Sequence, residues 1–183
     1  MNAERTNLKD CWIIEPDVYE DERGYFYEGY NSERFKSITG FEFEVKQINQ
    51  SRSSKGVLRG LHFQHGPMAQ SKLVSCIEGE VLDVAVDLRQ ESETFGKFSM
   101  VRLSVHNKKH FYIPKGMAHG FLVLTDHAKL MYQVDELYSP EHDSGIIYND
   151  KDINISWGMA EADIILSEKD KKLPTLKESN FNF

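Results

Sequence analysis

Apolar residues recur at every second position along much of the chain, which is the pattern of a β-strand with one buried face. The alternation is clearest over residues 81–88 and 130–134. Residues 43–51 begin with the same alternation, at Phe43 and Val45. Short turn signals rich in glycine, proline and aspartate separate such runs. Many short strands at this spacing predict an all-β fold, an antiparallel sandwich or barrel, rather than a parallel α/β sheet.

Two segments carry helix signals instead. Residues 31–40 open with a capping asparagine or serine and close on a glycine, so they predict one short helix. Residues 166–174 predict another, because Ser167 and Asp170 have the spacing of a capping box and a proline ends the run. The final residues, 177–183, are either a loose end or an aromatic segment that docks on a neighbour.

Length and charge narrow the class of protein. A chain of 183 residues that is 40% hydrophobic suits one folded domain, spanning residues 1–183, and excludes wholesale disorder. The net charge of -7, from 22 basic and 29 acidic residues, is unfavourable for binding nucleic acid or an anionic membrane. A small anionic ligand is still possible, because a few arginines suffice to bind one.

The cysteines and the N-terminal residues indicate the compartment. Cys11 and Cys76 lie far apart and form no CxxC pair, so neither a disulfide framework nor a zinc knuckle is expected. The N-terminal residues are polar, and no apolar run approaches the ~20 residues of a membrane helix. These features predict a soluble cytoplasmic protein in a reducing environment.

One stretch of the chain carries polar side chains that a buried strand does not need. Arg59, His62, Gln64 and Lys72 lie close together within a strand pattern. His62 and Gln64 share one face of that strand, whereas Arg59 has the wrong parity to join them. Gly60 lies between Arg59 and His62, and a glycine inside a strand often marks a bulge. A bulge would turn Arg59 and His62 toward one cavity, which predicts a binding site.

Each of these side chains has a plain structural interpretation as well. Histidine titrates near neutral pH in general, so His62 is either a neutral general base or a hydrogen-bonded structural histidine. Arg59 either offers its planar fork to a phosphate or carboxylate or makes an ordinary surface ion pair. Lys72 is either a functional cation or a solvated strand end. Their occurrence together favours function over the structural interpretations.

His119 follows a Pro-Lys-Gly turn and has three interpretations: a metal ligand, a substrate contact or a packed histidine. A metal site of the usual kind needs about three converging histidine or carboxylate ligands. Gln64 stands where a second histidine would complete a pair with His62, and neither HxH nor HExxH occurs. We therefore expect no metal, unless His62, His65 and His119 converge in the fold.

Other polar residues have two interpretations each. Gln47 and Asn49 continue the face that begins apolar at residue 43, so they line a pocket or mark where the strand leaves the core. Tyr132 and Tyr138 are six residues apart in a run that is predicted to be a strand, so they would lie on the same face. Each can donate a proton or stack on a ring, although Tyr132 also suits the core. Asp170 is as well suited to a helix cap as to catalysis.

Several motifs, taken together, resemble the dTDP-4-dehydrorhamnose 3,5-epimerase family of nucleotide-sugar enzymes. They are, in order, DERGYFYEGYN, QINQSRSSKGVLRGLHFQ, AQSKLV, GEVLDVAVDLR, TFGKF, YIPKGMAHGF, MYQVDELY and LSEKD, and they run from Asp21 to Asp170. The resemblance implies a cupin-type antiparallel jelly roll with a few short peripheral helices. It also implies a homodimer, a dTDP-sugar substrate and neither metal nor other cofactor.

The resemblance also implies roles for individual residues. His62 would be the base, Asp170 its orienting partner, Tyr132 the acid on the opposite face and Lys72 the cation that steadies the enolate. The substrate-binding positions would be Arg23 and Arg59 for the diphosphate, Phe26 and Tyr138 for the nucleobase, and Glu28, Gln47, Asn49 and His119 for the pocket lining. Gly66 and Met68 depart from the commoner family residues, in the loop before Lys72.

These roles fit the chemistry of a carbon acid. A proton next to a ketone is removable only if the negative charge of the enolate is met as it forms. Inversion then needs a base and an acid on opposite faces of the ring. The motifs leave open whether one carbon or two are inverted. A metal-dependent cupin and a non-catalytic sugar-binding sandwich are the remaining alternatives, and the absent histidine pair and the joint presence of base, acid and cation count against them.

Overall fold

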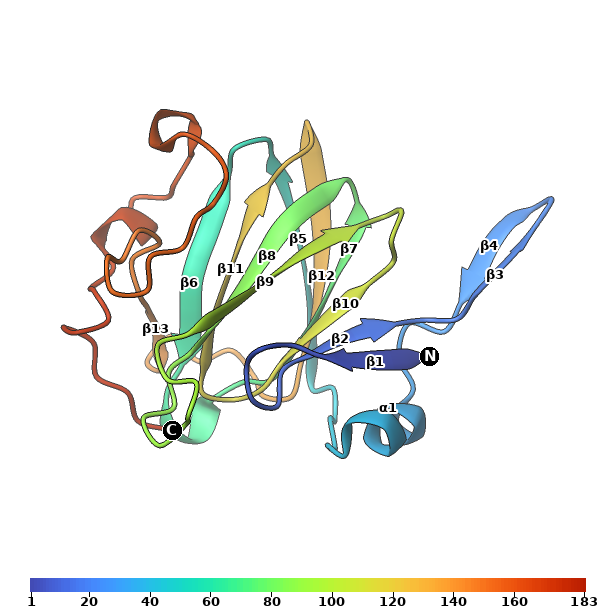
Figure 1. Ribbon diagram of the computed structural model, residues 1–183, viewed down its shortest axis with the longest axis horizontal. Coiled ribbons are helices and arrows are strands. Elements are labelled where there is room, and N and C mark those ends of the chain that lie inside the picture. Colours follow the sequence, from blue (N-terminus) through green and yellow to red (C-terminus); the bar gives the residue numbers. More distant parts are fainter.

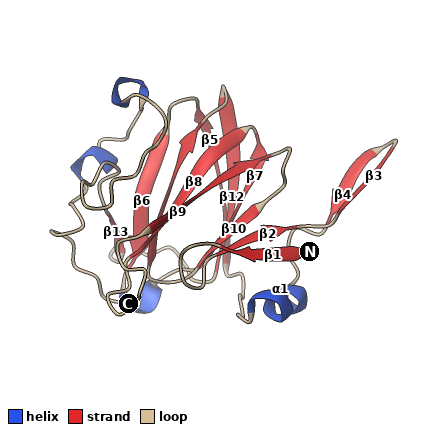
Figure 2. Cartoon of the chain, viewed as in Figure 1, coloured by secondary structure: helices blue, strands red, loops and turns tan.

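The computed structural model describes all 183 residues, and its strands form two large antiparallel sheets and a separate hairpin (Figures 1 and 2). The six-stranded sheet has the order β1 (Asn2–Arg5), β2 (Trp12–Glu15), β10 (His110–Ile113), β7 (Lys72–Glu78), β12 (His127–Val134) and β5 (Gln47–Ser54). The five-stranded sheet has the order β13 (Asp143–Gly145), β6 (Leu58–Gln64), β11 (Met117–Val123), β8 (Glu80–Asp87) and β9 (Phe98–Ser104). The prediction of an all-β antiparallel sandwich is confirmed.

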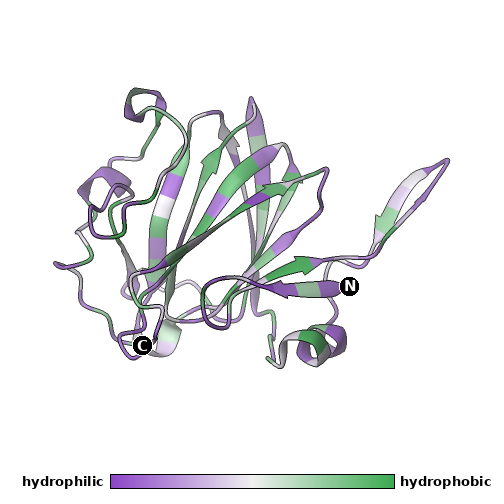
Figure 3. Cartoon of the chain, in the orientation of Figure 1, coloured by the Kyte–Doolittle hydropathy of each residue, from purple (hydrophilic) through white to green (hydrophobic).

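The main core lies between the two sheets, and the alternation in β8 shows how it is built. Val81 and Ala85 point into a cluster that also takes side chains from β7, β10, β11 and β12. Val84 and Val86 point the other way, into a second buried cluster. Asp83, on the inward face, is buried with the apolar residues. Figure 3 shows such hydrophilic bands interrupting the hydrophobic strands of the large sheets.

Helix α1 (Ser32–Thr39) covers part of the outer face of the six-stranded sheet. Its first turn is capped by Asn31, whose side chain accepts a hydrogen bond from the backbone N–H of Arg34. It ends at Gly40, whose φ of 82° lies in the left-handed region that glycine tolerates. Phe35 is fully buried against Tyr112 of β10, at a ring-centroid distance of 4.9 Å. The helix predicted over residues 31–40 is confirmed.

The second predicted helix, over residues 166–174, is wrong in extent. Only a single 3₁₀ turn forms there, η3 (Asp170–Lys172). The Ser167 hydroxyl does accept the backbone N–H of Asp170, at 3.1 Å, as a cap would. The reciprocal half of the capping box is missing, because the Asp170 carboxylate bonds His62 instead. The other 3₁₀ helices are η1 (Gly66–Met68) and η2 (Glu161–Asp163).

The C-terminal segment covers the outer face of the five-stranded sheet (Figure 1). Phe181 and Phe183 pack around Phe63 of β6, with ring centroids 6.0 Å and 5.6 Å away. The C-terminal aromatic residues therefore dock on their own chain.

The hairpin of β3 (Val18–Asp21) and β4 (Gly24–Tyr27) projects from the body of the molecule (Figure 1). Its residues are exposed except Tyr27, whose ring meets His110 edge to face at 6.1 Å. Strand β5 begins at Gln47, later than the run predicted from residue 43. No helix is long and apolar enough to cross a membrane, and the cytoplasmic location stays a prediction.

Candidate active site

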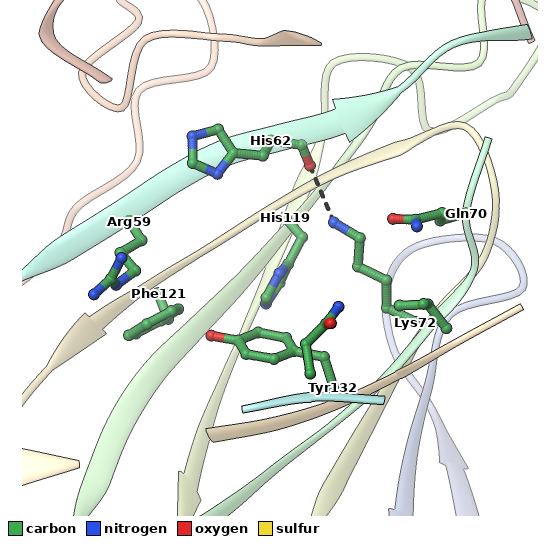
Figure 4. A pocket seen from close by; sticks show the side chains of 9 residues that line it. Arg59, His62, Gln70, Lys72, His119, Phe121 and Tyr132 are labelled. Atoms are coloured by element: carbon green, nitrogen blue, oxygen red, sulfur yellow. Dashed lines mark hydrogen bonds between the residues drawn. The ribbon is translucent and has the colours of Figure 1, made fainter. Parts of the chain in front are cut away.

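A cavity of about 200 Å³ lies between the two large sheets (Figure 4). Strands of both sheets contribute to its lining, which consists of Asn49, Arg59, His62, Gln70, Lys72, His119, Phe121, Tyr132 and Val134. His62 comes from β6 of the five-stranded sheet, and Tyr132 comes from β12 of the six-stranded sheet. The cavity therefore has two distinct walls, one from each sheet.

A bulge in β6 brings Arg59 and His62 to the same cavity. His119 of β11 pairs with His62, and Phe121 pairs with Arg59. Between these two pairs β6 therefore contains one more residue than β11, which is a β-bulge. Gly60 lies in the bulge with φ of 126°, and a Cβ there would approach Gly120 Cα to 2.6 Å. Only glycine fits this close approach without displacing backbone. The bulge predicted at Gly60 is confirmed.

His62 is held by a buried carboxylate from the C-terminal segment. Its Nε2 lies 2.7 Å from Asp170 Oδ1, and the Asp170 side chain is only 4% exposed. Burial raises the pKa of Asp170, but hydrogen bonds from His62 and Ser167 and a backbone bond from Gly60 outweigh it, so the net pKa is lowered. An ionised carboxylate only accepts, so Nε2 carries the proton and Nδ1 keeps a free lone pair. The contact fixes the orientation of the His62 ring, as the predicted role of general base requires.

Tyr132 lies across the cavity from His62 (Figure 4). Its hydroxyl is 2.8 Å from Ser51 Oγ on the neighbouring strand β5. Burial raises the pKa of the Tyr132 phenol above its ordinary value, with the Ser51 hydrogen bond opposing. The group therefore stays protonated at neutral pH and can serve as an acid.

Lys72, at the start of β7, reaches toward the backbone oxygen of His62, with Nζ at 3.4 Å. Burial lowers the pKa of Lys72 to about 8, while Asp143 and Asp83 act in the opposite direction. The ammonium thus carries its charge at neutral pH in the cavity lining, where a desolvated positive charge is suited to stabilising a developing oxyanion.

His119 is fixed by a residue that the sequence-based prediction missed. Its Nε2 lies 2.9 Å from Oδ1 of the fully buried Asp83, whose other carboxylate oxygen has no hydrogen-bond partner. Burial raises the pKa of Asp83, and His119 and Lys72 counteract this. The signal was visible, because an aspartate on the inward face of a strand needs a polar partner. Gln70 and Phe121, also in the lining, carry no comparable signal.

Further predicted residues gather near the cavity. Arg59 Nε donates to Ser53 Oγ at 3.0 Å. Gln47 lies outside the lining, but its amide donates to Asn49 Oδ1 at 2.7 Å and its oxygen accepts the backbone N–H of Tyr138 at 3.0 Å. Tyr138 follows β12 in a loop and is exposed, so the continuous strand expected through both tyrosines is wrong.

Gln64 has a structural role. Its amide nitrogen donates to the backbone oxygens of Met68 and Leu137, at 2.7 Å and 3.0 Å, and its side-chain oxygen accepts the backbone N–H of Ser139 at 2.7 Å. It is buried and does not line the cavity. These contacts tie β6 to the loops beside it.

Three predicted binding residues lie away from the cavity within this chain. Arg23 and Phe26 are on the projecting hairpin, where Arg23 pairs with Asp21 and Phe26 is 70% exposed. Glu28 follows the hairpin and accepts a hydrogen bond from the Asn31 amide at 3.1 Å. The structure therefore gathers the predicted catalytic residues but leaves part of the predicted binding set outside the cavity.

The histidines, cysteines and carboxylates form no group of three or more that could share a metal ion. His62 contacts Asp170 and His119 contacts Asp83, so each histidine has one aspartate as its partner. Metal independence stays a prediction. The fold and the cavity make this protein an antiparallel β-sandwich with a cavity between its sheets that is lined by histidine, lysine and tyrosine.

The chain belongs to the dTDP-4-dehydrorhamnose 3,5-epimerase family, whose family model matches residues 5–178. A dTDP-4-dehydrorhamnose 3,5-epimerase from Escherichia coli K12 is 52% identical over 178 residues, covering 97% of this chain and 96% of the relative. The family is one of isomerases, and the predicted membership is confirmed.

Solved structures show the same fold. A dTDP-4-dehydrorhamnose 3,5-epimerase from Elizabethkingia anophelis NUHP1 superposes with a TM-score of 0.96 at 54% identity, covering 99% of each chain. A dTDP-6-deoxy-D-glucose-3,5-epimerase from Legionella pneumophila, solved with dTDP-4-keto-L-rhamnose, superposes with a TM-score of 0.94 at 43% identity, covering 100% of this chain and 98% of the other. The predicted cupin-type jelly roll is confirmed.

Proposed function

We propose that this chain inverts C3 and C5 of dTDP-4-keto-6-deoxy-D-glucose to give dTDP-4-keto-L-rhamnose, a step of dTDP-L-rhamnose synthesis. The observation that carries the proposal is the placement of His62 and Tyr132 on opposite walls of one cavity (Figure 4). Inversion at carbon requires a base and an acid on opposite faces of the sugar ring, and this is the arrangement that two facing sheets supply.

His62 removes the proton next to the ketone, and Asp170 holds its ring and stabilises the imidazolium that forms. The electron pair of the broken C–H bond moves into the ketone, giving an enolate. The Lys72 ammonium meets the negative charge of that enolate oxygen. Tyr132 then delivers its proton to the opposite face of the same carbon. C3 and C5 both flank the ketone at C4, so the same groups act on both in turn.

Arg59, Asn49 and His119 are positioned to bind the substrate. Arg59 lines the cavity with its guanidinium anchored on Ser53, an arrangement suited to a diphosphate oxygen. The Asn49 amide is held by Gln47, and the His119 ring by Asp83. Side chains fixed in this way lose little freedom on binding, which favours a well-oriented sugar. Tyr138, exposed beside Gln47, is suited to stacking on the nucleobase.

We also propose a homodimer in which the β3–β4 hairpin of one subunit completes the binding site of the other. The hairpin exposes Tyr19, Tyr25 and Phe26 together with Arg23, an aromatic and basic set suited to a nucleotide. Within its own chain these residues have little to pack against (Figure 1). A second copy would cover the aromatic surface and supply the missing diphosphate and nucleobase contacts.

Solvent deuterium incorporation tests the proposed reaction. The protein is incubated with dTDP-4-keto-6-deoxyglucose in heavy water, and the label is located by mass spectrometry and NMR. We expect deuterium at both C3 and C5 and a product that a rhamnose-forming reductase accepts. Label at one carbon alone would make the protein a single-site epimerase, and absence of label at both would refute the proposed reaction.

A further inference from the structure

The Tyr132 hydroxyl has a single hydrogen-bond partner in the protein, the Ser51 hydroxyl at 2.8 Å. Two neighbouring rings lie beside the phenol ring, His119 at a centroid distance of 6.0 Å and Phe121 at 6.4 Å. The proposed acid therefore has one polar connection to the rest of the molecule, and that connection is a group able to donate and accept a proton.

An acid that gives its proton to carbon must regain one before it can act again. The phenol is partly buried in the cavity wall, and with the sugar bound against it a phenolate would be poorly solvated. Ser51 is partly exposed and belongs to β5, the edge strand of the six-stranded sheet. The hydroxyl group that contacts the phenol therefore belongs to a partly exposed residue at the edge of the sheet.

We propose that Ser51 positions the Tyr132 hydroxyl and returns a proton to it between the two inversions of one bound sugar. This inference rests on the proposed function, because a protein that inverts one carbon needs the return only after its product has left. It assigns a specific role to a residue that lies outside the cavity lining and that the sequence motifs did not single out.

The proton balance is complete with water as the only co-reactant. At the first carbon His62 takes one proton and the Tyr132 O–H bond breaks to supply another, leaving imidazolium and phenolate. The Ser51 hydroxyl donates its proton to the phenolate and takes one from water in the same step. His62, whose side chain is 31% exposed, releases its proton to water and is ready for the second carbon.

The proposal makes the two inversions unequal. The first uses the proton already on Tyr132, whereas the second waits for the return through Ser51. Removal of the Ser51 hydroxyl should therefore slow the second inversion by on the order of tenfold or more, within the range of a lost proton-transfer group. The first inversion should change much less, and a singly inverted sugar should accumulate.

The experiment is a single turnover with the full-length protein in excess over dTDP-4-keto-6-deoxyglucose. Quenched samples are reduced with borohydride and the singly and doubly inverted sugars are separated by chromatography. Ser51→Ala is compared with Ser51→Thr, which keeps a hydroxyl and suits a strand. Ser53→Ala is the matched control, since it makes the same change two residues along the same strand face but loosens Arg59 instead.

The proposal expects accumulation of the singly inverted sugar with Ser51→Ala and its restoration toward wild-type behaviour with Ser51→Thr. Ser53→Ala should raise the protein concentration needed for turnover while leaving the ratio of the two rates unchanged. Equal slowing of both inversions in Ser51→Ala would overturn the proton return and leave Ser51 with positioning alone. If the wild-type protein inverts only one carbon, the proposed function fails, and that result is separate from any effect of Ser51.

Discussion

The inter-sheet cavity and the β3–β4 hairpin hold their functional side chains in opposite ways. In the cavity each proposed catalytic or orienting group has a protein partner, as in the His62–Asp170 and Tyr132–Ser51 contacts. On the hairpin, Phe26 is exposed, and Arg23, in the turn, pairs with Asp21 of the same hairpin. Under the proposed function, one chain is enough to preorganise the chemistry, whereas binding of the nucleotide uses a surface that a second chain would complete.

The largest effect should come from the cavity side of this comparison. His62→Ala removes the proposed base, and we expect turnover to fall by ~10²–10⁴. Binding of dTDP should remain near the wild-type level, because the diphosphate and nucleobase contacts lie elsewhere. Turnover is followed by coupled reduction of the product, and dTDP binding by calorimetry. Turnover close to wild type would remove His62 from the role of base.

The second largest effect should come from Lys72. Lys72→Met keeps the length of the side chain but removes the charge that meets the enolate, and we expect a loss of ~10²–10³ in kcat. The same variant should melt at a higher temperature, because the buried ammonium is costly in the folded state. Thermal unfolding at pH 7 checks this. A variant that is both inactive and less stable would contradict the assigned role.

A subunit-mixing experiment tests the hairpin side. Phe26→Ala should raise KM by roughly 5- to 150-fold, the range for one lost base–aromatic stack. If the hairpin serves the other subunit, co-expression of Phe26→Ala with His62→Ala should regenerate activity, since one site of the mixed dimer would keep both residues. Size-exclusion chromatography establishes the assembly state. A mixture no more active than its two components would show that the hairpin does not act across subunits.

The smallest effect should be a dependence of activity on pH that arises from Lys72 in the cavity. Burial lowers the pKa of Lys72 to about 8, so the ammonium is lost as the pH rises through that value. Activity at pH 9 should therefore be about a tenth of its plateau, from one unit of titration. Phe26→Ala should keep this profile with a raised KM. A profile that is flat from pH 7 to pH 9 would contradict the role of Lys72.

Protein stability should rise with pH as Lys72 loses its proton, whereas activity should fall. The ordinary value is 10.5, so between about pH 8 and pH 10.5 the folded protein releases the Lys72 proton while the unfolded chain retains it. Stability from this group therefore rises with pH in that window. The difference in melting temperature between Lys72→Met and wild type should shrink as the pH rises from 8 to 10.

Local patterns carried much of the prediction, and they failed where a tertiary contact competed. The cap of α1 and the bulge at Gly60 were predicted because both depend on neighbours in the chain. The helix over residues 166–174 was wrong because the Asp170 carboxylate bonds His62 rather than its own capping box. The inward position of Asp83 was visible in the sequence, but its pairing with His119 was missed because the two residues lie on different strands of the sheet.

The all-β class and the short helix after the hairpin could be predicted from the amino-acid sequence, which also carries the family motifs and the residue types needed for acid–base chemistry. Alternation, capping and glycine conformations are local properties, so residues close in the chain are enough to specify them. The tertiary structure alone decided which of those residues meet. His62 and Asp170 are separated by 108 positions, and Ser51 and Tyr132 by 81. Packing of the sheets and of the C-terminal segment closes these distances, because burying the apolar faces outweighs the entropy of long loops.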